Sequence, residues 1–190
     1  LDYALLSAPG APLKQALLDA KIGKDIYGSF EDGIKQTFFS IVAKGANLNQ
    51  KEEFIKVIRD TLTKIAEEGI DKKAVTAGIN YYEFRFREAD FSSYPKGLMY
   101  GLDILSSWLY DDTKPFCEVQ LLEGFEFLKK ALEEGYFEEL IRKYLLDNTH
   151  GAILSLVPEK GLAAKRDKEL ESKAGELQKR AFLMKSLPGW

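Results

Sequence analysis

The chain has 190 residues, 45% of them apolar, and carries 27 basic and 30 acidic side chains for a net charge of −3. This size fits one ordinary domain with an appendage, and the missing basic excess argues against a nucleic-acid partner. The single cysteine, Cys117, excludes an internal disulfide and fits a reducing compartment. No apolar run approaches the roughly 20 residues that span a bilayer, so we expect no membrane partner. Because the chain opens on Leu1 rather than Met, we expect a cut point there, made in cloning or by proteolysis.

The N-terminal part is expected to form a short helix followed by extended structure. Residues 11–20 are rich in helix formers, which come after Pro12, and this predicts the helix. Residues 35–43 are rich in Phe, Thr, Ile and Val, which predicts a strand. The glycines between these segments are expected in loops or at strand ends: Gly23, Gly28 and Gly33.

Residues 51–69 carry the clearest helical pattern in the chain. Their apolar side chains recur at helical spacing on one stripe: Phe54, Ile55, Ile58, Leu62, Ile65 and Ala66. Asn47 and Asn49 offer a cap for this helix, and Asn49 with Glu52 resembles a capping box. Gly69 fits the position just past its end.

Four more helices and a strand are expected before Pro158. The helices are predicted over residues 71–88, 95–110, 121–134 and 137–146, and the strand over residues 152–157. The helix over residues 71–88 is expected to bury Ala74, Val75, Ile79, Tyr82 and Phe86. The strand sequence, Ala-Ile-Leu-Ser-Leu-Val, is typical of a largely buried strand, and Pro158 ends it.

After Pro158 the chain becomes highly charged. A seam of apolar residues at steps of four and three runs through it: Leu170, Ala174, Leu177, Ala181 and Met184. The spacing fits a helix that packs on a partner helix, and it equally fits an ordinary amphipathic terminal helix. Together these elements predict an α+β fold, with helices layered on a small, mostly antiparallel sheet and a charged C-terminal helix.

The chain cannot hold the metal site of a zinc peptidase on its own. Such a site needs two histidines one helical turn apart with an acidic base, as in His-Glu-x-x-His or its inverse, His-x-x-Glu-His. His150 is the only histidine, and Gly151 and Ala152 follow it. We therefore expect no catalytic, cofactor-binding or metal-binding residue in this chain.

Other catalytic or phosphate-binding motifs are also missing from the sequence. No Gly-x-Ser-x-Gly elbow is present, and His150 is more typical of a structural histidine beside a strand than of a general base. Gly28 and Gly33 have the spacing of a phosphate-binding loop, but Ile34 stands where the lysine is needed. Two acidic residues inside that loop would also repel phosphate.

One charged pair and one group of aromatic residues remain as candidates. Glu83 and Arg87 lie four residues apart on the predicted helix, so a structural ion pair is expected, worth about 0.3–0.5 kcal/mol if exposed. Nearby aromatic side chains could line a peptide-binding wall: Tyr81, Tyr82, Phe84, Phe86 and Phe91. For Tyr82 and Phe86 the stripe favours packing in the core, whereas the pattern does not decide for the other three.

Five sequence blocks, in order along the chain, resemble the presequence proteases, a subfamily of the pitrilysin/insulinase-type zinc metallopeptidases. These blocks are Ser7 with Pro12-Leu13 and Ala16-Leu17; Thr37-Phe38-Phe39-Ser40; Pro95-Lys96-Gly97-Leu98; Trp108-Leu109-Tyr110-Asp111; and Asn148-Thr149-His150 followed by Val157-Pro158. The resemblance covers nearly the whole chain.

The resemblance implies a place for the chain in a larger peptidase. Residues 1–158 are similar to the second domain of the N-terminal half, a non-catalytic half-domain that forms part of a chamber wall. Residues 159–190 would be the first arm of a helical-hairpin linker. The zinc site of such a protein belongs to an earlier domain, and His150 matches a position that is not a ligand. The strand and helix that begin such a domain would lie before Leu1, wholly or in part.

Two functional hypotheses follow. In the first, the chain is a wall and linker segment of a zinc endopeptidase that degrades short unfolded peptides. In the second, it is a non-enzymatic interaction module, like a core subunit of the same superfamily. The expected partners are the remainder of the parent chain and its peptide substrates, with self-association of the segment through an open sheet edge and the bare seam. The compartment would be cytoplasmic in a bacterium, or the mitochondrial matrix or a plastid in a eukaryote.

Overall fold

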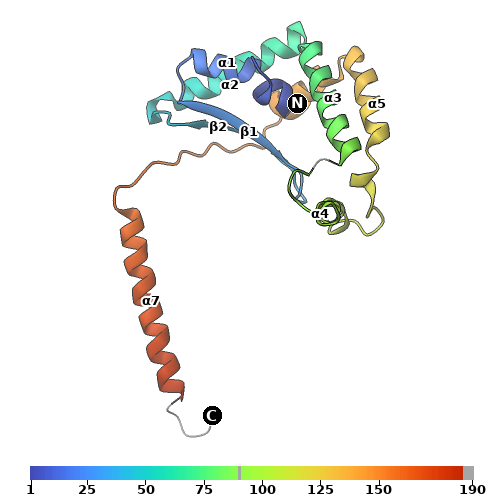
Figure 1. Cartoon of the computed structure of the whole chain (residues 1–190). Coiled ribbons are helices and arrows are strands. Elements are labelled where there is room, and N and C mark those ends of the chain that lie inside the picture. Colours follow the sequence, from blue (N-terminus) through green and yellow to red (C-terminus); the bar gives the residue numbers. More distant parts are fainter. Residues whose placement is uncertain (90, 186–190) are drawn as a thin grey trace. The chain divides into compact units, whose positions relative to one another are not determined.

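The computed structural model describes residues 1–89 and 91–185, and for residues 179–185 it describes the backbone alone. The chain divides into two compact units, Leu1–Gly151 and Ala152–Trp190. The assignment of residues 1–158 and 159–190 to separate domains with separate roles stays a prediction. The architecture is α+β, as expected, with helices packed around a small antiparallel sheet (Figure 1). No helix among the described residues is both long and apolar enough to cross a membrane.

The sheet of the first unit is one hairpin. Strand β1, Asp25–Glu31, pairs antiparallel with β2, Phe38–Lys44, so that Gly28 lies opposite Ile41. Strand β2 confirms the strand predicted over residues 35–43. Gly28, expected at a loop or strand end, instead lies in the middle of β1. The reason is space: a Cβ atom at Gly28 would lie 2.4 Å from the Ser40 carbonyl oxygen and 2.5 Å from Leu6 Cδ1.

Helices cover one face of this hairpin (Figure 1). A π-helical turn η1, Tyr3–Ser7, comes first, followed by α1, Pro12–Asp19, which confirms the helix expected after Pro12. Leucines of both elements are fully buried, together with one isoleucine before β1 and one within it: Leu5, Leu6, Leu13, Leu17, Ile22 and Ile26. These residues belong to the core of the first unit, which continues into the next two helices.

The two long helices match the sequence pattern closely at their bodies. Helix α2, Lys51–Glu68, contributes Leu62, Ile65 and Ala66 to the core, and α3, Lys72–Glu88, contributes Val75 and Ile79. Gly69 ends α2 with φ 99°, a conformation that glycine adopts without strain.

The start of the first of these helices differs from the prediction. The capping box joins Asn47 and Gln50 rather than Asn49 and Glu52, because a short 3₁₀ turn η2, Leu48–Gln50, precedes α2. The Asn47 backbone N–H donates to Gln50 Oε1 at 3.0 Å. The pattern S/T/N-x-x-E/Q occurs twice in this stretch, and the backbone uses the earlier copy.

The remaining helices of the first unit are shorter. They are α4, Lys96–Trp108; the 3₁₀ turn η3, Cys117–Val119; α5, Leu122–Ala131; the 3₁₀ turn η4, Leu132–Glu134; α6, Tyr136–Leu140; and the π-helical turn η5, Ile141–Leu146. They confirm the three helices predicted in these regions. Gly135, with φ 78°, separates η4 from α6 as expected. Phe137 and Ile141 are buried in the core, which ties this last pair to α2.

The second unit contains the largest departure from the sequence analysis. Residues 152–157, predicted as a largely buried strand, carry no assigned strand, and their apolar side chains are exposed, Leu154 by 86% and Leu156 by 97%. The prediction was wrong for this structure because a strand is buried only when a sheet edge receives it, and no described strand pairs with this segment.

A long helix follows that segment. Helix α7, Leu162–Lys185, confirms the predicted charged C-terminal helix. Of its predicted seam, Leu170, Ala174 and Leu177 are exposed to solvent. Ala181 and Met184 lie outside the part of the chain whose side chains are described.

Candidate functional site

Three tyrosines form a cluster where α3 meets η1. The Tyr3 ring stacks on Tyr81 at 5.8 Å between centroids, and Tyr82 meets both rings edge-on, at 6.1 Å and 5.3 Å. Tyr82 was predicted to lie in the core stripe, but it remains 45% exposed. Its ring packs on other aromatic rings at the surface, so Tyr82 departs from the buried stripe that was predicted for α3.

Phe86, in contrast, follows the prediction. It is half-buried, and its ring lies 5.8 Å from that of Phe125 on α5. Of the five candidate aromatic residues on and after α3, Phe86 therefore serves the packing of α3 against α5. Tyr81 belongs to the tyrosine cluster, and the Arg85 guanidinium lies over its ring, 5.7 Å from the centroid.

A concavity of about 380 Å³ lies where α3 passes into α4, lined by Phe84, Glu88, Ala89, Phe91, Ser92, Tyr94 and Lys96. It brings together Phe84 and Phe91, the two candidates for which the sequence pattern did not decide. Phe84 and Tyr94 are largely exposed at its edge. The Phe91 ring packs edge-on against Tyr100 at 5.2 Å, which holds the loop on α4.

The backbone around this concavity has an uncommon conformation. Ala89 and Ser92 both have positive φ, 48° and 55°. Residues other than glycine adopt such angles at a cost of order 1–3 kcal/mol, and at Ala89 the angle is that of a left-handed C-cap, which ends α3. The Lys96 ammonium donates to the Glu88 carbonyl oxygen at 3.4 Å, which joins two lining residues of the concavity. The walls are thus aromatic, with one acidic and one basic side chain.

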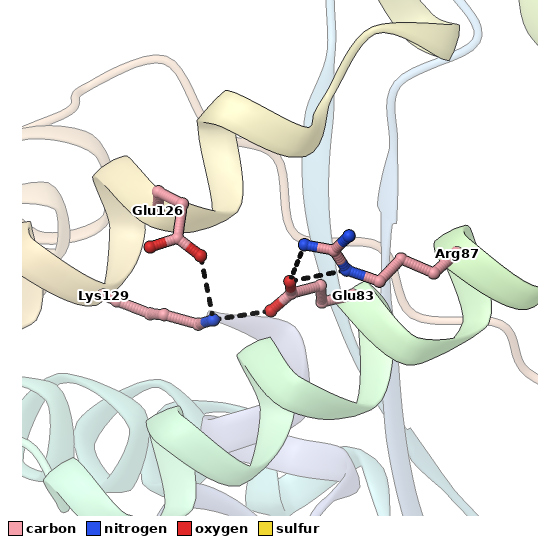
Figure 2. A network of polar contacts seen from close by, with 4 residues as sticks. All are labelled: Glu83, Arg87, Glu126 and Lys129. Atoms are coloured by element: carbon pink, nitrogen blue, oxygen red, sulfur yellow. Dashed lines mark hydrogen bonds and ion pairs between the residues drawn. The ribbon is translucent and has the colours of Figure 1, made fainter.

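A polar network beside this region joins α3 to α5 (Figure 2). Glu83 Oε1 accepts from Arg87 Nη2 at 2.6 Å and from Nε at 2.8 Å, and Glu83 Oε2 lies 2.6 Å from Lys129 Nζ. Lys129 also pairs with Glu126 at 3.3 Å. Glu83 is only 9% exposed. The Glu83–Arg87 pair forms as predicted, but it is not the simple exposed pair for which a small energy was expected.

The network sets the charge states of its members. The hydrogen bonds from Lys129 and then Arg87 hold the pKa of the Glu83 carboxyl below its ordinary value. The bonds to Glu83 and then Glu126 raise the pKa of Lys129. Both groups are therefore charged near neutral pH, and the carboxylate has both oxygens engaged. Such a group holds two helices together, whereas a general base needs a free oxygen.

The other residues singled out in the sequence lie apart from one another. His150 is exposed, and its backbone N–H donates to Asn148 Oδ1 at 2.8 Å. Cys117 lies in η3 beside Glu118, with Sγ to Oε1 at 3.6 Å. Among the side chains that the structure describes, those of residues 1–89 and 91–178, no three from His, Cys, Asp or Glu lie close enough together to hold a metal ion. The expectation that the chain has no metal-binding residue stays a prediction.

The sequence analysis missed two features of the region. Lys129 lies 46 residues from Glu83 in the chain, and no periodicity relates positions on different helices. Tyr3 comes from the first residues of the chain, yet its ring fills the space over Gly78, where a Cβ atom would lie 2.7 Å from Tyr3 Cδ1. The glycine in the middle of α3 was the available clue, because a helix interior disfavours glycine unless something packs closely on it.

Comparison with known proteins shows similarity along almost the whole chain. It is 46% identical over 187 residues to Protein HypA of Clostridium perfringens, covering 98% of this chain and 19% of that protein. It is 35% identical over 174 residues to presequence protease 1, chloroplastic/mitochondrial, of Arabidopsis thaliana, covering 89% of the chain and 16% of that protein. The chain is presequence-protease-like.

The same relationship extends to animal members. The chain is 25% identical over 190 residues to the mitochondrial presequence protease of Danio rerio, covering 98% of the chain and 18% of that protein. The resemblance inferred from the five ordered blocks is thereby confirmed. No family model matches the chain. The chain spans less than a fifth of the length of these curated relatives. The two presequence proteases are named as mitochondrial or chloroplastic proteins, whereas the Clostridium perfringens relative is bacterial.

Proposed function

We propose that this chain is a non-catalytic segment of a presequence-protease-type zinc metalloendopeptidase, where it forms part of the wall around short unfolded peptides. One observation carries the proposal. The similarity to Arabidopsis presequence protease 1 runs along 89% of the chain, yet that protein is about six times longer, and the chain's single histidine excludes both zinc motifs. The metal and the attacking water would then be supplied by the rest of the protein, and residues after Pro158 would begin the linker.

The concavity between α3 and α4 supports a role in contacting peptides. Phe84, Phe91 and Tyr94 offer aromatic surface with little side-chain entropy to lose, and such surface accepts many different apolar side chains. Its charges are sparse and balanced between Glu88 and Lys96. A wall that handles unfolded peptides of varied sequence needs this kind of tolerant apolar surface.

The test compares the 190-residue chain with the longer protein encoded around it. We expect the longer protein to bind stoichiometric zinc and to cleave a fluorogenic peptide in a chelator-sensitive manner. The isolated chain should bind no stoichiometric zinc, measured by mass spectrometry of the metal in tag-free protein, and should cleave nothing. Chelator-sensitive turnover by the isolated chain, or a longer protein without peptidase activity, would refute the proposal.

A matched pair of variants in the longer protein tests the wall role. Phe84→Ala removes the exposed ring at the concavity and should raise KM for peptides with little change in kcat, because it removes binding that is equal in the ground and transition states. Tyr144→Ala removes an exposed ring of similar size on η5, away from the concavity, and should leave KM unchanged. Equal effects of the two variants would count against a peptide contact at Phe84.

A non-enzymatic interaction module is the second candidate. The apolar side chains exposed on residues 152–157 favour it, since such a segment binds other strands without needing a metal. A longer protein that forms stable complexes and holds no zinc would support this function over the first. The self-association expected from the sequence remains a prediction, which light scattering of the isolated chain over a range of concentrations checks.

A further inference from the structure

Helix α4 has an apolar face that nothing in the first unit covers. Four leucines, Leu98, Leu102, Leu105 and Leu109, follow one another at steps of four, three and four along the helix and its first following residue. They are exposed by 54%, 51%, 42% and 70%. At about 100° per residue these positions fall within an arc of about 60°. They form one stripe, which we call the leucine stripe.

This exposure is specific to α4. None of the 13 residues of α4, all of which are described, is buried, although its sequence is rich in leucine, isoleucine and methionine. Helices α2 and α3 of the same unit bury their apolar stripes in the core. The leucine stripe is therefore not the usual scattering of single apolar residues on a surface.

The opposite side of α4 is already held in place. Tyr100 packs edge-on against Phe91 at 5.2 Å, and Ser107 Oγ donates to the Lys114 carbonyl oxygen at 3.1 Å. Met99 and Ile104 are half-buried. Because these contacts anchor the helix by its other side, the leucine stripe is presented outward in a set orientation. A stripe in a set orientation can be complementary to a partner of defined shape.

We propose that the leucine stripe is an internal interface of the longer protein, covered by an amphipathic helix from polypeptide outside these 190 residues. The spacing is compatible with a helix as the occupant, because side chains at steps of four and three can interdigitate with the ridges of a second helix. The cross-linking experiment below separates a helix from a strand. Along the axis the stripe extends about 17 Å, or three turns. The occupant would present its own apolar stripe over about three turns.

The size of the relatives argues for the source of that helix. The matched proteins carry more than four fifths of their length outside the region similar to this chain. A face of four leucines flanked by the exposed ring of Trp108 is then expected to meet another domain rather than water. This inference rests on the proposed function to the extent that it needs the longer protein, but it does not need that protein to be a peptidase.

Thiol labelling tests whether the stripe is covered. In a Cys117→Ser background, Leu102→Cys should react rapidly with a thiol reagent in the isolated chain. It should react about tenfold more slowly or less in the longer protein, where the cover must open before the thiol is reached. Glu67→Cys, at an exposed charged position on α2, is the control and should react equally fast in both proteins.

Cross-linking tests whether the cover is a helix. Short photo-reactive probes are attached at Leu98→Cys and, separately, at Leu109→Cys in the longer protein. Over the span of about 17 Å between these positions, a helix lying along the stripe places its contacts about 11 residues apart, whereas a strand places them about 5 apart. Cross-links about 11 residues apart in one helical segment are the expected result.

Each other outcome overturns a different statement. Equal labelling of Leu102→Cys in the two proteins means that the stripe stays open, and the inference fails while the peptidase proposal stands. Protection that appears in the isolated chain only at high concentration identifies a second copy as the occupant and also refutes the inference. Protection in the dilute isolated chain places the cover within the 190 residues. A reading frame that ends with this chain refutes both proposals together.

Discussion

Gly28 gives a quantitative test of how the hairpin meets the helices. In the Gly28→Ala variant the new Cβ would lie 2.4 Å from the Ser40 carbonyl oxygen and 2.5 Å from Leu6 Cδ1. Leu6 is fully packed and the Ser40 oxygen belongs to the neighbouring strand, so neither atom yields cheaply. Overpacking of this kind costs about 1–3 kcal/mol. Replacing a strand glycine by alanine returns about 0.5–1 kcal/mol in backbone entropy.

The expected result is a net loss of stability. The two terms leave a fall of about 0–2.5 kcal/mol in the free energy of unfolding, centred near about 1.3 kcal/mol, and so a decrease in Tm of up to about 10 °C for a chain of this size. Circular dichroism during thermal and urea unfolding measures it. Gly124→Ala on α5 is the control, because no atom lies within 4 Å of its Cβ position and alanine favours the helix. A Gly28→Ala variant as stable as Gly124→Ala would refute the close approach of η1 to the hairpin.

Substitutions at four further positions test a helix cap, the polar network, a loop carboxylate and the core. Asp71→Ala removes the side-chain cap of α3 and should lower stability by about 1 kcal/mol in urea titrations, whereas Asp71→Asn should lose less. Glu83→Gln should lower Tm at neutral pH; because the folded pKa of Glu83 is depressed, that difference should shrink as the pH falls through the acid range. Asp111 has its pKa lowered from 3.8 to about 2, chiefly by hydrogen bonds from Thr113, so its stabilising effect should be complete above about pH 4 and disappear towards pH 2. Asp111→Asn should accordingly match the unaltered chain in Tm only at the acid end. Leu13→Ala, at a fully buried position, should cost about 2–5 kcal/mol.

The helices of the first unit were predictable because their signals are local. The body of α2 follows from the spacing of its apolar residues, and Asp71 and Gly69 mark a start and an end by their own chemistry. The errors at the start of α2 have the same local origin: two overlapping capping patterns compete, and the sequence alone does not rank Asn47 above Asn49. Periodicity thus locates a helix better than it locates the helix ends.

The candidate site was less predictable because it depends on contacts between distant segments. The aromatic residues on and after α3 were singled out in the sequence, but only the structure separates Phe86, which packs on Phe125, from Phe84, which lines the concavity. The carboxylate of Glu83 was paired correctly with Arg87, one turn away, while Lys129 on another helix gave no signal. Interactions at helical spacing are visible in a sequence, and those between elements are not.

The exposed apolar segment after Gly151 shows what periodicity measures. The pattern of residues 152–157 states that these side chains favour burial, but it does not state which surface buries them. Covering a leucine is worth about 1.5–3 kcal/mol, so Leu154 and Leu156 together offer about 3–6 kcal/mol to any partner that receives them. That sum is comparable with the whole stability of a small domain. The leucine stripe of α4 has the same character, since its residues satisfy a packing pattern without a packing partner. The exposed segment 152–157 and the leucine stripe therefore lead to the same prediction. The free energy of unfolding of this chain is expected to be lower than that of the same 190 residues inside the longer protein that we propose.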